Sequence, residues 1–226
     1  MNVIEKTAHF LNSPVLPSSK PLVCVVDNEI QTRQSLHRLF LAASLPVCVF
    51  TSATEFLEHE RHQGPCCLVI DPGAPGMDVF ELQRVLTNSA NQIIFLTARA
   101  DVAMCAQAMK AGAADFLIKP ASPEILLEAT NRALSRSETI LSTKAVHSAA
   151  MAKFTSLTSR EFAVMQRVIA GLLNKQIAAD LGIAEKTIKI HRGRVMRKTG
   201  VVSVADLVRL AIAADIPDYI RENKAS

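Results

Sequence analysis

The stretch Cys66-Cys67-Leu68-Val69-Ile70-Asp71 carries the pattern that decides the fold. Five consecutive apolar residues that stop at an acidic residue are typical of a strand buried on both faces of a parallel sheet. Three more apolar runs stop at a polar residue: Val23–Val26 at Asp27, Ile93–Leu96 at Thr97 and Phe116–Ile118 at Lys119. Because ligands bind outside the carboxyl ends of parallel strands, we expect these four polar groups to lie together at one edge.

Strand and helix patterns alternate from Leu22 to Leu134. The expected strands are Val23–Val26, Val47–Phe50, Cys66–Ile70, Ile93–Leu96 and Phe116–Ile118. The expected helices are Ile30–Ala43, Ser52–Arg61, Val79–Leu86, Asp101–Ala111 and Glu124 to at least Leu134. Such strict alternation predicts an α/β domain with a doubly wound, five-stranded parallel sheet over residues 22–134.

A second, smaller domain is expected at residues 154–226. It begins with a capping box, Thr158 to Glu161, before a helix that Gly171 ends. The further helices expected are Asn174–Leu181, Ala184–Lys198 and Ser203–Ala214. The pattern predicts an all-α domain of four helices, joined by a helical linker at 135–153, and residues 1–21 are expected to form a mobile extension.

Charge is divided unevenly between the two parts. Residues 151–226 hold 13 Lys or Arg against 7 Asp or Glu, whereas residues 1–150 hold 12 against 14. Six basic and no acidic residues lie between Lys186 and Lys198. Such a local excess of positive charge attracts a polyanion, although a solvated basic face would look the same.

Composition restricts the remaining function classes. No apolar stretch approaches the roughly 20 residues of a membrane span, so a cytoplasmic protein without membrane contact is expected. The cysteines lack the spacing of a zinc site and are expected to be reduced core residues, with a thiol switch as the alternative: Cys24, Cys48, Cys66, Cys67 and Cys105. Neither a Gly-rich phosphate loop nor a nucleophile–base pair occurs, so an enzyme with its own small-molecule substrate is not expected.

The first domain resembles the receiver domain of two-component response regulators. The matching motifs are Val-Val-Asp27-Asn28-Glu29, Asp71-Pro-Gly-Ala-Pro75, Thr97-Ala98, Lys110-Ala-Gly112-Ala and Asp115-Phe116-Leu-Ile-Lys119-Pro120. The resemblance implies a flavodoxin-like fold and assigns the site residues by position: Asp71 as phosphoacceptor, Thr97 and Lys119 as phosphoryl partners, Phe116 as the switch residue, and Asp27, Asn28, Asp71 and Gly73 as ligands of Mg²⁺.

Three positions depart from the receiver pattern. Asn28 replaces the second acidic residue, Ala74 replaces Met, and Val79 replaces Gly. The change at Asn28 matters most, because an amide oxygen coordinates Mg²⁺ without contributing a negative charge. Magnesium binding is therefore expected to be weak, and control without phosphorylation remains an open alternative.

The second domain resembles the LuxR-type helix-turn-helix of the NarL/FixJ family. The matching segments are Leu157-Thr-Ser-Arg-Glu161, Gly171-Leu-Leu-Asn-Lys-Gln-Ile-Ala178, Leu181-Gly-Ile183 and Lys186-Thr-Ile-Lys-Ile-His-Arg192. Helical spacing places Ile188, His191 and Val195 on the buried stripe. The expected DNA contacts are Asn174, Lys186, Thr187, Lys189, Ile190, Arg192, Gly193, Arg194, Arg197 and Lys198, of which Lys189, Ile190 and Gly193 match the positions that reach base edges.

Together the two resemblances imply a DNA-binding transcriptional regulator. A histidine kinase would phosphorylate Asp71, and the phosphorylated receiver would dimerise so that two recognition helices bind double-stranded DNA. The alternative is an atypical receiver controlled by a protein, a ligand or thiol oxidation.

Overall fold

The computed structural model describes residues 20–59, 62–99 and 101–217 of the 226-residue chain. The chain divides into two units between Leu141 and Ser142. The predicted mobile extension, apart from its last two residues, lies outside the described residues, and so does Arg61, the predicted end of one helix.

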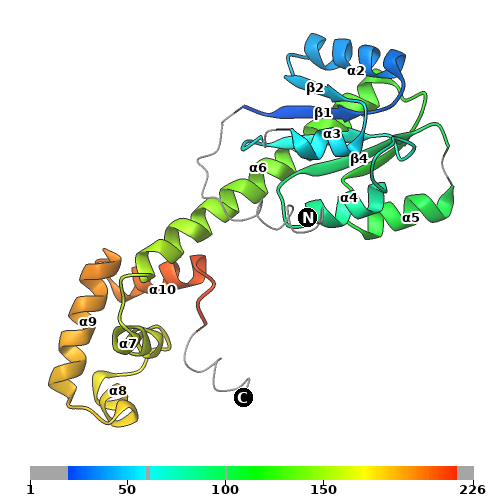
Figure 1. Cartoon of the computed structure of the whole chain (residues 1–226). Coiled ribbons are helices and arrows are strands. Elements are labelled where there is room, and N and C mark those ends of the chain that lie inside the picture. Colours follow the sequence, from blue (N-terminus) through cyan, green and yellow to red (C-terminus); the bar gives the residue numbers. More distant parts are fainter. Residues whose placement is uncertain (1–19, 60–61, 100, 218–226) are drawn as a thin grey trace. The chain divides into compact units, whose positions relative to one another are not determined.

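The N-terminal unit is built on a five-stranded parallel sheet (Figure 1). Its strands are β1 (Leu22–Val26), β2 (Val47–Phe50), β3 (Cys66–Ile70), β4 (Gln92–Thr97) and β5 (Asp115–Ile118). They lie in the order β2-β1-β3-β4-β5, and every neighbouring pair is parallel. This is the doubly wound order of flavodoxin-like folds, so the predicted fold class is confirmed.

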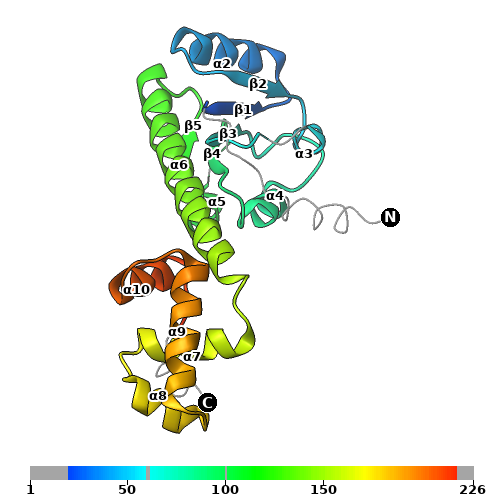
Figure 2. The ribbon, with the colours of Figure 1, turned by 90° about the vertical axis from the view of Figure 1, so that its left-hand side faces the viewer.

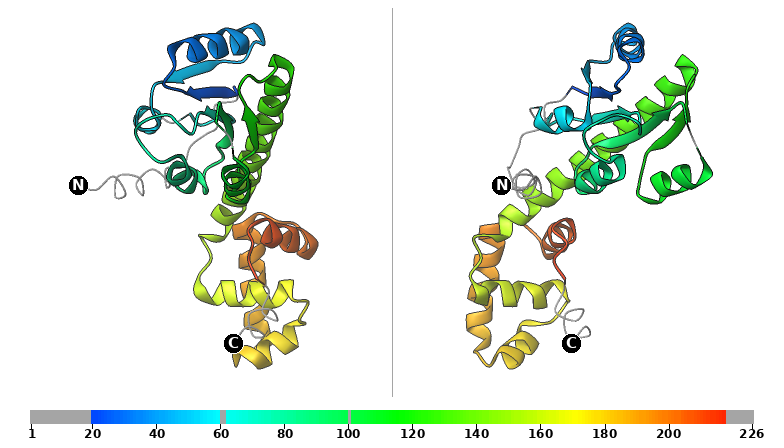
Figure 3. Two further views of the ribbon diagram at one scale, coloured as in Figure 1. Left: turned by 90° about the vertical axis from the view of Figure 1, so that its right-hand side faces the viewer. Right: turned by 45° about the vertical axis from the view of Figure 1, so that its right-hand side comes forward.

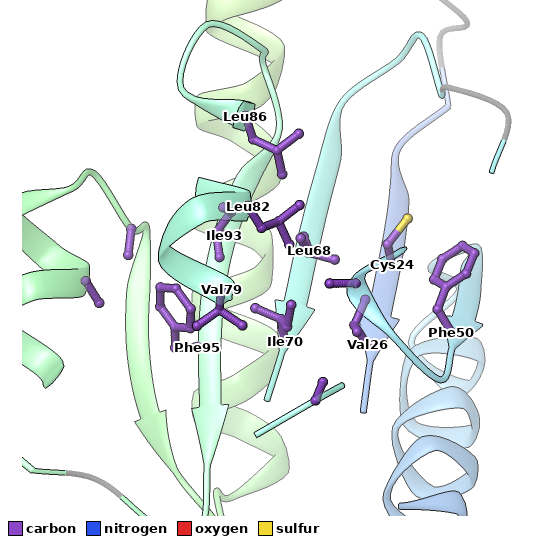
Figure 4. Packing of buried hydrophobic residues seen from close by; sticks show 14 of the residues in the cluster. Cys24, Val26, Phe50, Leu68, Ile70, Val79, Leu82, Leu86, Ile93 and Phe95 are labelled. Carbon is purple, nitrogen blue, oxygen red and sulfur yellow. The ribbon is translucent and has the colours of Figure 1, made fainter. Parts of the chain in front are cut away.

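Helices cover both faces of the sheet. They are α2 (Ile30–Ala42), α3 (Ala53–Glu58), α4 (Val79–Leu86), α5 (Val102–Lys110) and α6 (Pro123–Phe154). Helices α2 and α6 pack on one face (Figure 2), and α3, α4 and α5 contribute to the hydrophobic cluster on the other. Within β1, Val23 and Val25 belong to the first face, and Cys24 and Val26 to the second (Figure 4). Burial on both faces explains why the strand sequences are continuously apolar.

Helix α6 continues beyond Leu134 through residues 135–153, where a helical linker was expected. It runs unbroken for 32 residues, as the green to yellow-green helix in Figure 3 shows. No glycine or proline follows Pro123 within it, so nothing in its sequence ends the helix at Leu134. Beyond that residue, buried Ser137 accepts a hydrogen bond from the Cys66 backbone N–H at 3.0 Å, which joins α6 to the start of β3.

The C-terminal unit contains four further helices, as predicted, and no strand among its described residues. They are α7 (Ser159–Ile169), α8 (Asn174–Leu181), α9 (Glu185–Thr199) and α10 (Val204–Ala213). The end of α6 contributes Ala150 and Phe154 to their common core. Gly182 and Gly200 end α8 and α9 in the left-handed conformation that glycine adopts without steric penalty.

One ion pair fixes the start of α7 to the end of α9. The Glu161 side chain is only 3% exposed and accepts hydrogen bonds from Lys198 Nζ at 2.6 Å and from the Thr158 backbone N–H at 2.9 Å. The Lys198 ammonium and the Thr158 backbone lower the pKa of Glu161 to about 2. Lys198 Nζ also donates to the Ser156 backbone oxygen at 2.9 Å.

We expect Glu161→Gln to destabilise the C-terminal unit at neutral pH. A carboxyl group whose pKa is lowered on folding stabilises the fold at pH values above its pKa in the unfolded chain, which is near 4.5. This stabilisation is lost as the pH falls towards the pKa in the folded protein, about 2. The melting temperature of the variant should therefore lie below that of the wild type at pH 7, and the difference should shrink in acid. Hydrogen exchange of α7 and α9 amides in the full chain locates the effect. Asp215→Asn, an exposed change in the same unit, is the control, and an equal effect of both variants would contradict the assignment.

Candidate functional sites: the sheet edge and the basic helix

The carboxyl edge of the sheet brings together Asp27, Asp71 and Lys119. Asp27 follows β1, Asp71 follows β3 and Lys119 follows β5. Lys119 Nζ lies 2.6 Å from Asp27 Oδ2 and 2.5 Å from Asp71 Oδ2, so one ammonium group bridges the two carboxylates. The Lys119 backbone N–H donates to the Thr97 carbonyl oxygen at 2.8 Å, which holds the end of β5 against β4.

The two carboxylates differ in accessibility. The Asp27 side chain is 2% exposed, and its Oδ1 accepts a hydrogen bond from the Glu29 backbone N–H at 2.8 Å. The Asp71 side chain is 14% exposed, and its Oδ1 accepts from the Gly73 backbone N–H at 2.8 Å. Asp71 is therefore the carboxylate that a reactant from solvent can approach, whereas Asp27 supplies fixed negative charge beside it.

The charge state of Lys119 follows from these neighbours. Burial by itself would lower its pKa, but the hydrogen bonds and charges of Asp27 and Asp71 outweigh this effect and raise the pKa above the ordinary value. Lys119 is thus protonated at neutral pH. A protonated amine between two carboxylates removes most of the repulsion that would otherwise keep them apart.

Thr97 and Phe116 stand beside this group in a different arrangement. Thr97 is buried at the end of β4, and its Oγ1 lies 3.1 Å from both the backbone nitrogen and the backbone oxygen of Arg99. Its hydroxyl is therefore bonded to the following loop. Phe116 on β5 is half-buried, and its ring packs against that of Phe95 with the centroids 6.0 Å apart.

The remaining predicted metal ligands also lie at this edge. Asn28 directly follows Asp27 and is exposed, and Gly73 lies two residues after Asp71. A Cβ atom at Gly73 would come within 3.3 Å of Asp71 Oδ1, so glycine allows this close turn. In the described part of the chain, no three His, Cys, Asp or Glu side chains are grouped to hold a metal ion.

Helix α9 presents most of the predicted DNA-contact residues on its surface. Seven are exposed: Lys186, Lys189, Ile190, Gly193, Arg194, Arg197 and Lys198. Ile188 and Val195 are fully buried, as their helical spacing indicated. His191, which the same spacing placed on the buried stripe, is only half-buried, and its Nδ1 has no hydrogen-bond partner among the described residues.

Four of the predicted contacts are less exposed or already bonded within the protein: Asn174, Thr187, Arg192 and Lys198. Arg192 Nη1 donates to Asn174 Oδ1 at 2.8 Å, which ties α9 to the first residue of α8. Thr187 is half-buried in the first turn of α9. Lys198 is held by Glu161 and by the Ser156 carbonyl oxygen, so its ammonium group already has a structural role.

The sequence patterns did not single out several residues at these sites. Arg33 on α2 donates from Nη1 to the Asp27 backbone oxygen at 2.7 Å. Lys175 and Glu185 line a shallow surface groove between the start of α8 and α9. The sequence did contain a signal that could have identified these two residues. Lys175 follows Asn174, a predicted DNA contact, and Glu185 lies four residues before Lys189 on one helix face.

The cysteines lie mostly inside the N-terminal unit. Cys24, Cys66 and Cys67 are buried, and the sulfur atoms of Cys24 and Cys66 lie 3.9 Å apart on adjacent strands. The hydrogen bond with Cys66 and burial raise the pKa of Cys24, and burial raises that of Cys67. Since the thiolate is the reactive form, this environment disfavours oxidation.

No helix in the described ranges is long and apolar enough to cross a bilayer.

Comparison with known proteins identifies the family. Residues 23–131 match the family model described as "Response regulator receiver domain", and residues 155–211 match "Bacterial regulatory proteins, luxR family". Nodulation protein W of Bradyrhizobium diazoefficiens is 41% identical over 86% of each chain, and the transcriptional regulatory protein FixJ of Azorhizobium caulinodans is 34% identical over 89% of this chain and 96% of its own. The solved structure of the response regulator StyR aligns with a TM-score of 0.75 at 42% identity, over 85% of this chain and 98% of that one. The chain therefore belongs to the NarL/FixJ family of response regulators, transcriptional regulators that join a receiver domain to a LuxR-type DNA-binding domain.

Proposed function

We propose that phosphorylation of Asp71 controls DNA binding by α9. The observation that carries this proposal is the position of the Asp71 carboxylate, which is partly accessible to solvent and held beside Asp27 by the ammonium group of Lys119. The domain boundaries we propose are 22–134 for the receiver and 154–226 for the DNA-binding domain, joined by residues 135–153. The role we propose is regulatory rather than enzymatic, since the relatives FixJ and StyR are named as regulators, and a protein that acts on chromosomal DNA would work in the cytoplasm.

The proposed reaction transfers one phosphoryl group. A carboxylate oxygen of Asp71 forms a bond to phosphorus, while the phosphorus–nitrogen bond of a phosphohistidine on a histidine kinase breaks. Lys119 can follow the new negative charge because it already contacts Asp71 Oδ2. The Thr97 hydroxyl must leave Arg99 to donate to a phosphoryl oxygen, and Phe116 beside it can then change its packing.

The oxygen donors at this edge fit Mg²⁺. The carboxylates of Asp27 and Asp71, the amide oxygen of Asn28 and the carbonyl oxygen of Gly73 would hold it, and waters would complete its coordination. When bound, the ion neutralises charge on the phosphoryl oxygens. Asn28 supplies no negative charge, and Lys119 is positive. The site therefore attracts Mg²⁺ less strongly than a site with a third carboxylate at position 28 would.

The amide at position 28, in place of a carboxylate, also favours a second candidate function, which is regulation of the receiver without phosphorylation. A protein or ligand that binds the receiver would then replace the phosphoryl group as the signal. Control by thiol oxidation has less support, because the two closest thiols, Cys24 and Cys66, are buried and one has a raised pKa.

The first test is phosphorylation of the full chain by acetyl phosphate with increasing Mg²⁺, followed by intact mass. We expect one phosphoryl group per chain in the wild type and none in Asp71→Asn. Asn28→Asp restores a charged ligand and should lower the Mg²⁺ concentration for half-maximal phosphorylation about tenfold, equivalent to about 1.4 kcal/mol of cation binding.

Asn131→Asp is the matched control, because it adds the same charge on an exposed turn of α6. It should leave the Mg²⁺ dependence unchanged. A wild type that is never phosphorylated, beside an Asn28→Asp variant that is, would exclude phosphoryl control and favour the second candidate.

We further propose that dimerisation of the phosphorylated receiver places two α9 helices in successive major grooves of double-stranded DNA. Lys189, Ile190 and Gly193 would reach base edges, and the remaining contacts would be to phosphates: Asn174, Lys186, Thr187, Arg192, Arg194 and Arg197. The proposal leaves out Lys198, because Glu161 and Ser156 already bind its ammonium group. The test of dimerisation is the molar mass of the full chain in solution with and without beryllofluoride; a dimer is expected only with it.

The proposed phosphate contacts predict how binding to random-sequence duplex DNA depends on salt. Each phosphate contact releases about 0.9 counterion equivalents, so Arg194→Gln and Arg197→Gln should each reduce the slope of log K against log [salt] by about 1. The exposed Arg160 on α7 lies outside the proposed contact set, and Arg160→Gln should leave the slope unchanged. Equal slopes in all three variants would contradict the assignment of α9 to the DNA backbone.

A further inference from the structure

The surface groove between α8 and α9 contains one carboxylate among cations. Its lining residues are Leu173, Asn174, Lys175, Glu185, Lys189 and Arg192. Three of the six side chains are basic, and Glu185 alone is acidic. A groove that served only to hold phosphate would bind more tightly without this acid, because like charges repel. The presence of Glu185 therefore calls for a partner other than phosphate.

The position of Glu185 in α9 narrows the choice of partner. It is the first residue of the helix, and its side chain is 48% exposed. Lys189, one turn further along the same face, is 67% exposed, and the two head groups are 4.0 Å apart. Ion pairs this exposed contribute little to stability, so the pair with Lys189 does not account for the carboxylate. The helix dipole favours an acid in this turn by a modest amount.

We propose that Glu185 is a specificity-determining residue that accepts a hydrogen bond from the N4 amino group of a cytosine in the major groove. The inference rests on the proposed binding of α9 to DNA. In helix-turn-helix proteins the N-terminal residues of the recognition helix contact base edges, and Glu185 and Lys189 occupy the first two turns of α9. A carboxylate only accepts hydrogen bonds, and cytosine N4 is the donor that Glu commonly reads in this groove.

Lys189 complements this contact chemically. A lysine donates to O6 and N7 of guanine, so the two side chains together would select a cytosine next to a guanine. At a guanine or a thymine, Glu185 would face only acceptor atoms of that base, and beside a phosphate it would be repelled, so there it opposes binding. Glu185 would thus lower the affinity for non-specific DNA while the surrounding cations raise it, which increases the ratio between specific and non-specific binding.

The experiment compares the full-length wild type with Glu185→Gln, each with Mg²⁺ and beryllofluoride, in selections from a random-sequence duplex pool. The wild type should select a site with a cytosine at one position of each half-site, and the variant should lose the preference at that position only. On the selected duplex and a scrambled duplex of equal composition, the ratio of dissociation constants should fall about fivefold or more in the variant, because one good base contact discriminates by roughly that factor. Part of the change should be tighter binding to the scrambled duplex.

Asp215→Asn provides the control, since it removes one exposed acidic charge from the same unit but not from α9. It should leave both the selected site and the ratio unchanged. If Glu185→Gln selects the wild-type site and strengthens binding to both duplexes equally, Glu185 acts only through its charge and this proposal is wrong, while DNA binding by α9 stands. If the wild type binds neither duplex, the proposed function fails and this inference fails with it. Unchanged melting of the variant shows that the helix itself is intact.

Discussion

The ammonium group of Lys119 is the contact on which the arrangement of the sheet edge depends. Two carboxylates at the ends of neighbouring strands repel each other, and the ammonium group between them, which contacts both, offsets this repulsion. The fold supplies this cation from β5, across β4, because all these strands end at one edge. In the proposed mechanism a phosphoryl group at Asp71 adds negative charge here, so the contacts of Lys119 and the hydroxyl of Thr97 must adjust. The adjustment can spread to Phe116 because its ring already packs against β4.

Asn28 changes how such a site treats a metal ion. Asp27 and Asp71 each contribute one negative charge, and Lys119 contributes one positive charge. The net charge of the unphosphorylated site is therefore small, and the site attracts a divalent cation only weakly. A phosphoryl group would raise the negative charge considerably at neutral pH. If the proposed phosphorylation takes place, magnesium binding and phosphorylation should be coupled more tightly in this chain than in one with a third carboxylate, because the ion would bind strongly only to the phosphorylated site.

The sequence predicted the fold class and the neighbours at the sheet edge because both follow from local patterns. Buried parallel strands are continuously apolar, and the residue after each strand lies at the same edge. The sequence could not show features that depend on contacts between residues far apart in the chain, or on the orientation of a hydroxyl group. Lys198 looked like another phosphate contact, yet Glu161, far away in sequence, binds it, and Thr97 is bonded to the backbone of Arg99. The helical linker expected at 135–153 is part of the unbroken α6, because no glycine or proline interrupts it.

The charges of α9 show that the number of basic residues bears on general attraction to DNA more than on the recognition of a particular base sequence. Of the six basic residues from Lys186 to Lys198, Lys198 is bound within the protein and Arg192 is shared with Asn174, so fewer side chains are free to meet phosphates than the count implies. Those that remain would attract any duplex, because phosphates are the same at every sequence. Discrimination between bases must come from side chains that do not simply attract phosphate. In the proposed complex these would be the exposed methyl groups of Ile190, the open backbone at Gly193 and the carboxylate of Glu185, together with Lys189 where it reaches a base edge.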